Sequence, residues 1–191
     1  MSHGDDKYMF WDTAGLNEAE DGTMSSQAAV QNLLRLVKDH GVDLLIYCIR
    51  GRLPNIIRVN YDLFWGIICR KEVPIVLVVT GLEGKDDMDE WWKENQKAIK
   101  KMTMSFNGHA CITSWKGRKN RYEKEYKESA EEVWKLVREH CRSTAWSMPP
   151  EWPSQAEKAI KAHNQTYYNA HSGNGLQKFL QQLARFFSLR K

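Results

Sequence analysis

Hydrophobic residues follow two different patterns along the chain. Continuous apolar segments at residues 43–49, 73–80 and 109–114 are too short for helices and are typical of buried strands. The segment YMFW at residues 8–11 is a fourth, shorter strand candidate. Between these segments, apolar residues recur every three or four positions, which indicates amphipathic helices. We expect those helices at residues 29–37, 56–68, 89–101 and 129–141.

The alternation of strands and helices predicts the fold class. Strands separated by helical segments of ten or more residues form βαβ units, whose strands lie parallel. The sequence therefore predicts an α/β fold of three layers, in which a mainly parallel sheet carries helices on both faces.

The last part of the chain has a different composition. Residues 143–154 hold three of the five prolines and are expected to form a linker rich in proline and tryptophan. Residues 155–191 are then a helical extension, whose last helix has an apolar stripe opposite a polar side. We expect this amphipathic helix to dock on the domain. Contact with a membrane surface or with a protein partner is the alternative.

Composition narrows the function classes. The chain has 191 residues, 42% hydrophobic and 27% charged, as in one globular domain with a modest extension. Its net charge of +4 is small and spread along the chain, so nucleic acid is not an expected partner. No stretch has the length and apolarity of a transmembrane segment, and the first residues lack a signal-peptide pattern, so we expect a cytoplasmic protein.

The four cysteines are widely separated, and three lie in apolar runs where we expect buried thiols rather than zinc ligands.

Three short polar motifs directly follow predicted strands. The first is Asp12-Thr13-Ala14-Gly15, after residues 8–11. A carboxylate at a strand end can hold Mg²⁺ through water, and a glycine three residues later lets a backbone N–H approach a phosphate. Asp12 is therefore a candidate magnesium ligand, and Asp12 and Gly15 are candidate nucleotide-binding residues. A strand-to-loop turn capped by Asp12 is the structural alternative.

The second motif, Thr80-Gly81-Leu82-Glu83, follows the strand at residues 73–80. It occupies the place where GTP-binding proteins carry the motif that reads the base. There, a carboxylate accepts hydrogen bonds from the N1–H and the amine of guanine, and a polar residue three positions earlier braces the loop. Glu83 and Thr80 are the candidates for these two roles, whereas Gly81 offers no side-chain stem to pack on the base. A plain polar loop is the alternative.

The third motif, Thr113-Ser114-Trp115-Lys116-Gly117, closes the strand at residues 109–114. It resembles the SAK loop of GTP-binding proteins, in which a backbone N–H meets the O6 atom of guanine. The indole of Trp115 can in addition stack on a base. Ser114, Trp115 and Lys116 are therefore candidate nucleotide-binding residues.

The order of these motifs resembles that of the P-loop GTPases of the translation-factor-related class, in particular the septins, the immune-associated GTPases and fungal G-domain proteins. The segments DTAGLNE, VVTGLE and CITSWKG carry the resemblance, which covers residues 7–141. It implies a P-loop NTPase-like G domain, partial here and at residues 1–142, that binds GTP or GDP with Mg²⁺. It also implies GTP hydrolysis by a full-length form, with a protein partner or a homodimer as the expected assembly.

The chain departs from this family at three points. It has no phosphate-binding GxxxxGKS or GxxxxGKT sequence, without which a triphosphate loses most of its ligands. Leu16 stands where many GTPases have a glutamine that orients the attacking water, so we assign no catalytic residue and leave activity as an enzyme open. The resemblance also implies that the central first strand is missing. We therefore expect a truncated chain, with residues 8–11 adjacent to residues 44–49 or separated from them by a gap.

Two further function classes stay open beside a GTP-binding, GTPase-like protein with impaired nucleotide binding. One is a pseudo-GTPase that serves as an interaction module, through the Trp-rich helix at residues 89–101 or through the amphipathic C-terminal helix. The other is an unrelated flavodoxin-like α/β domain, which leaves the order of the three motifs unexplained.

Overall fold

A computed structural model describes most of the chain up to residue 159. The described residues are 2–3, 6–12, 26–53, 57–152, 155–156 and 158–159. The chain divides into two compact units, one made of Met1–Gly41 with Ser147–Lys191 and the other of Val42–Trp146. Each unit is described by itself below.

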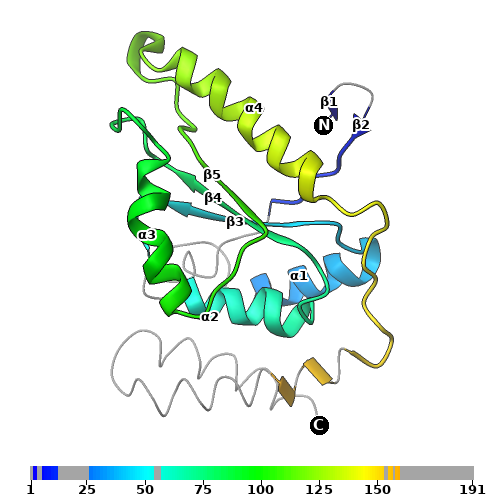
Figure 1. Cartoon of the computed structure of the whole chain (residues 1–191). Coiled ribbons are helices and arrows are strands. Elements are labelled where there is room, and N and C mark those ends of the chain that lie inside the picture. Colours follow the sequence, from blue (N-terminus) through cyan, green and yellow to red (C-terminus); the bar gives the residue numbers. More distant parts are fainter. Residues whose placement is uncertain are drawn as a thin grey trace. The chain divides into compact units, whose positions relative to one another are not determined.

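The second unit is built on a parallel sheet of three strands (Figure 1). The strands are β3 (Leu45–Arg50), β4 (Ile75–Thr80) and β5 (Gly108–Cys111), in the spatial order β3-β4-β5. β4 is central and pairs in parallel with both neighbours. Three of the four strand predictions and the parallel direction are therefore confirmed.

Helices follow each of these strands. The elements are α2 (Ile57–Tyr61), its π-helical continuation η2 (Asp62–Ile68), α3 (Glu90–Lys101), the short 3₁₀ turn η3 (Arg118–Asn120) and α4 (Glu123–His140). The helices predicted at residues 56–68 and 89–101 are confirmed. α4 begins six residues before the predicted start, because its first turns carry ion pairs rather than an apolar stripe. Lys127 lies 3.2 Å from Glu123, and Lys124 lies 3.6 Å from Glu128.

Side chains of β4 divide the core of this unit into two layers. Ile75, Leu77 and Val79 point to one face of the sheet, where they join a cluster that includes Trp91 and Ile99 of α3. The alternate residues Val76 and Val78 point to the opposite face and join Leu136 of α4. Figure 1 shows α3 and α4 on opposite sides of the strands. The α/β prediction with helices on both faces of a parallel sheet is thus confirmed for this unit.

The first unit contains the helix α1 (Ser26–His40) and a small antiparallel pair, β1 (Ser2–His3) with β2 (Asp6–Lys7). The helix predicted at residues 29–37 is confirmed and extends to His40. It ends there because Gly41 has a φ of 72°, and its N–H donates to the Val37 carbonyl over 3.0 Å.

The strand predicted at residues 8–11 is wrong. These residues form no strand, and Met9 is 77% exposed. Among the described residues, the only strand that pairs with β3 is β4, so the expected pairing of residues 8–11 with residues 44–49 is wrong as well. The alternative, a gap between these two segments, stays a prediction because they belong to different units. A four-residue apolar run gains ladder hydrogen bonds only beside another strand. Its aromatic rings here make other contacts, and Trp11 stacks on His40 with 4.6 Å between ring centroids.

The predicted linker and extension are described only in part. In the second unit, Val42 and Trp146 form an isolated antiparallel bridge. In the first unit, the Trp152 side chain is buried. The amphipathic C-terminal helix predicted near the end of residues 155–191 lies outside the described residues. No helix in the described part of the chain combines the length and the apolarity needed to cross a membrane.

Candidate functional site

The carboxyl ends of β3, β4 and β5 meet at one edge of the sheet, because the three strands are parallel. The last residue of β4 and the loops that follow β4 and β5 carry most of the predicted nucleotide-binding residues. They are Thr80, Glu83, Ser114, Trp115 and Lys116. A direct contact joins the two loops, because the Thr113 hydroxyl oxygen lies 3.4 Å from Oε2 of Glu83. The structure therefore brings the second and third motifs together.

Thr113 holds this junction in place. Its side chain is 1% exposed, and its N–H donates to Oγ of Ser129 in α4 over 3.1 Å. The hydroxyl accepts the N–H of Trp115 over 3.2 Å and lies 3.0 Å from the Trp115 carbonyl oxygen. Its single proton serves either that carbonyl or Glu83 at any one time. One buried hydroxyl thus positions both the carboxylate and the residue that carries the indole.

Trp115 presents an open aromatic face at this edge. Its side chain is 56% exposed, although large apolar side chains in this unit are mostly buried. The ring lies 6.3 Å from the ring of Tyr122, measured between centroids. The ammonium of Lys116 lies 5.2 Å from the Tyr126 centroid, a cation–π contact with α4. Ser114 is exposed. The loop is therefore supported from α4 while the indole stays accessible.

Thr80 braces the end of the sheet rather than the loop of Glu83. Its hydroxyl donates to the Ile49 carbonyl over 3.3 Å and so joins β4 to β3. Gly81, the next residue, has a φ of 77°, a conformation that favours glycine. Thr80 therefore lies at this edge of the sheet, but its hydroxyl bonds to Ile49 of β3 and not to the loop of Glu83.

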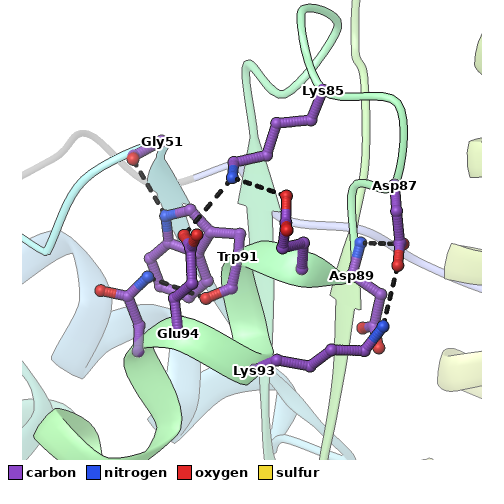
Figure 2. Close-up of polar contacts among 9 residues, drawn as sticks. Gly51, Lys85, Asp87, Asp89, Trp91, Lys93 and Glu94 are labelled. Carbon is purple, nitrogen blue, oxygen red and sulfur yellow. Dashed lines mark hydrogen bonds and ion pairs between the residues drawn. The ribbon is translucent and has the colours of Figure 1, made fainter.

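The loop after β3 is a part of the site that the sequence prediction missed. Nε1 of the buried Trp91 donates to the Gly51 carbonyl over 2.9 Å, so α3 fixes this turn (Figure 2). Gly51 has a φ of 57°. The only sequence signal was Gly51, two residues after the apolar run that ends at Ile49. Apolar patterns alone do not tell which loops become neighbours.

Lys85 is engaged by α3. Its ammonium lies 3.4 Å from Oε2 of Glu90 and 3.3 Å from Oε2 of Glu94, and Figure 2 shows Lys85 reaching toward Glu94. Desolvation lowers the pKa of Lys85, but hydrogen bonds and charges of Glu94 and Glu90 outweigh it, and the pKa is raised. The ammonium therefore stays protonated and directed to the helix.

The tryptophans of α3 are used inside the unit. Trp91 is buried, and Trp92 stacks on His109 with 4.1 Å between centroids and 14° between planes. Nε2 of His109 lies 3.0 Å from Oδ1 of Asp89, at the start of α3. Both tryptophan rings of the helix that we considered as a partner-binding surface, Trp91 and Trp92, therefore pack within their own unit.

Two buried cysteines of this unit, Cys69 and Cys111, have thiols that stay protonated near neutral pH. Burial raises the pKa of Cys69 to about 12, and burial together with the charge of Asp89 raises that of Cys111 to about 12. Cys48 is exposed despite its apolar surroundings in sequence, which corrects the expectation of a buried thiol there. Successive side chains of a strand point to opposite faces, so Cys48 points away from the face on which Ile49 is buried. Cys48 lies on the face that carries α4, but α4 packs mainly on β4 and β5 and leaves this part of β3 exposed.

The first motif belongs to the other unit and is described only at Asp12. Asp12 is exposed and belongs to the first unit, and Gly15 lies outside the described residues. Within the described part of the chain, no group of three or more His, Cys, Asp or Glu side chains is arranged to hold a metal ion. Magnesium binding by Asp12 through water stays a prediction.

Comparisons of this chain with known proteins found no relative. No protein-family model matches the chain, and neither a curated protein nor a solved structure matches it. The α/β fold and the geometry of the sheet edge are therefore the basis for assigning a function.

Proposed function

We propose that the carboxyl edge of the three-stranded sheet binds a guanine nucleotide, GTP or GDP. One observation carries the proposal: the contact of 3.4 Å between the Thr113 hydroxyl and Glu83. It brings a half-buried carboxylate beside a loop whose indole is 56% exposed. A carboxylate next to an open aromatic face suits a planar base with hydrogen-bond donors on one edge.

Glu83 gives the site its preference for guanine. Its carboxylate accepts hydrogen bonds from the N1–H and the exocyclic amine, and such charge-assisted bonds are among the stronger ones. Adenine presents an unprotonated N1 at the same position, which a carboxylate repels. Trp115 stacks on the base. The backbone N–H of Trp115 already donates to the Thr113 hydroxyl oxygen. The backbone N–H groups of Ser114 and Lys116 are therefore the donors for guanine O6.

The base, rather than the phosphates, supplies most of the binding energy in this proposal. The chain has no GxxxxGKS or GxxxxGKT sequence, and the ammonium of Lys85 is engaged by Glu90 and Glu94. We therefore expect modest affinity. We assign no catalytic residue, and GTP hydrolysis and Mg²⁺ at Asp12 are expectations from the resemblance alone.

Titration with GDP labelled on the ribose, in the presence of Mg²⁺, tests the proposal. We expect saturable binding that GTP displaces and ATP does not. Glu83→Gln should weaken binding about 10- to 100-fold, because the negative charge is lost and one of the two acceptor oxygens becomes an amide N–H₂ group that faces a donor of guanine. Trp115→Ala should weaken it about 5- to 100-fold through lost stacking.

Asp86→Asn is the matched control, because Asp86 is an exposed carboxylate in the same loop. Its affinity should equal that of the unmodified chain. Absence of binding at tens of micromolar labelled GDP, or equal displacement by ATP and GTP, would contradict the proposal.

A further inference from the structure

Arg50 occupies the space in which a side chain of residue 81 would lie. Arg50 is the last residue of β3 and stands opposite Thr80 in the sheet register. A Cβ atom added to Gly81 would lie 2.9 Å from Cγ and 3.2 Å from Nε of Arg50. The stem of Arg50 therefore crosses directly over Gly81, at the start of the loop that carries Glu83.

The backbone around Arg50 is held on several sides. β4 pairs with Arg50 itself, the N–H of Arg52 donates to the Arg50 carbonyl over 2.6 Å, and Nε1 of Trp91 donates to the Gly51 carbonyl. The side chain, by contrast, is exposed and makes no ion pair or hydrogen bond with any described residue. The guanidinium therefore has a fixed backbone beneath it and five N–H donors that no described residue uses, so it is available to contact a ligand.

We propose that Arg50 provides a stacking surface for the base that Glu83 binds, with the guanidinium plane against the purine ring. The inference rests on the proposed guanine site and names a further residue that positions the base. A guanidinium is planar and weakly hydrated, so it stacks on aromatic rings, whereas an ammonium is a compact and strongly hydrated charge. Arg50 thus replaces, from the neighbouring strand, the side chain that Gly81 lacks.

The same cation could instead contact a phosphate group of the nucleotide. The two contacts differ in what they require of the ligand. Stacking needs only the base, so it acts equally on guanosine and on GDP. A phosphate contact acts on GDP alone.

The test uses the full chain, ribose-labelled GDP, and unlabelled guanosine as competitor. Arg50→Ala should weaken the binding of GDP and of guanosine by the same factor, roughly 3- to 30-fold. Arg50→Lys should also weaken both, because the charge is kept and the plane is lost. Arg52→Ala removes an exposed arginine two residues away and should change neither affinity. Thermal unfolding of each variant checks that the fold is intact.

Each other result overturns the inference. A loss for GDP without a loss for guanosine, or full recovery in Arg50→Lys, assigns Arg50 to a phosphate. Unchanged binding by Arg50→Ala removes Arg50 from the site and leaves the guanine proposal standing. Absence of binding by the unmodified chain removes both proposals together.

Discussion

Thr113 shows how a single hydroxyl group joins parts of the molecule that are distant in sequence. It lies between Glu83, Trp115 and, through its N–H, Ser129. A buried polar group costs free energy unless it has partners, and here the partners are the two loops of the proposed site. Binding residues on loops are held in a defined position only when buried residues fix those loops.

Thr113→Val tests this role at the residue scale. The substitution keeps the shape of the side chain and removes the hydroxyl, which leaves the N–H of Trp115 without its acceptor. We expect the free energy of unfolding to fall by about 1 to 3 kcal/mol, measured by urea denaturation, and GDP binding to weaken. Retained affinity in a destabilised variant would contradict a positioning role for this hydroxyl.

Among the elements, α3 does more than cover the sheet. Trp91 packs in the core and also binds the turn after β3, while Asp89 and Trp92 hold His109 at the other side of the helix. The helix thereby fixes the position of Gly51, next to Arg50. Its N-terminal half carries the contacts that shape the loop edge.

Trp91→Phe tests this function of α3. Phenylalanine keeps most of the apolar contact but loses the hydrogen bond to the Gly51 carbonyl. We expect a loss of about 1 to 3 kcal/mol in unfolding free energy, from the lost bond and the smaller ring, with weaker GDP binding. Trp92→Phe is the matched control, because Trp92 stacks on His109, and its affinity for GDP should stay unchanged. Equal effects of both variants on affinity would refute the assignment.

The sequence predicted elements well where an apolar pattern alone decides them. β4 was predictable because the apolar run IVLVV is continuous and too short for a helix, and its five residues are all buried in the sheet. Residues 8–11 carry a similar but shorter run, and nothing in the run itself shows whether a neighbouring strand exists. The start of α4 was missed because ion pairs, not apolar residues, fill its first turns. For the site, the loops of Glu83 and Trp115 were predicted, whereas Arg50 and Thr113 depend on which strand ends are neighbours.

At the scale of the whole molecule, buried titratable groups set an alkaline limit to stability. Burial raises the pKa of Cys69 from 9.0 to about 12 and also raises the pKa of Tyr47. The folded chain therefore keeps protons that the unfolded chain releases above about pH 9. The stability these groups provide is complete below their ordinary pKa values and is lost as the pH rises toward the folded values.

We therefore expect the free energy of unfolding to fall from about pH 9 upward. Cys69 alone contributes at most about 1.4 kcal/mol per pH unit. Urea denaturation between about pH 8 and pH 11 measures the slope. Cys69→Ala should reduce it, whereas Cys48→Ala, at an exposed thiol, should leave it unchanged. A slope that Cys69→Ala does not alter would show that this thiol titrates normally in the folded chain.

The order of the strands has a kinetic consequence. In the register of the sheet, Leu45 pairs with Ile75, and Val76 pairs with Gly108, so each ladder joins residues about 30 positions apart. Neither ladder of this sheet can begin at a tight turn, and each must close a long loop before any strand contact compensates the lost chain entropy. Helical segments form within microseconds. We expect the sheet to assemble later and at a rate governed by this topology, so the edge that carries Glu83 and Trp115 is completed only when β5 joins β4.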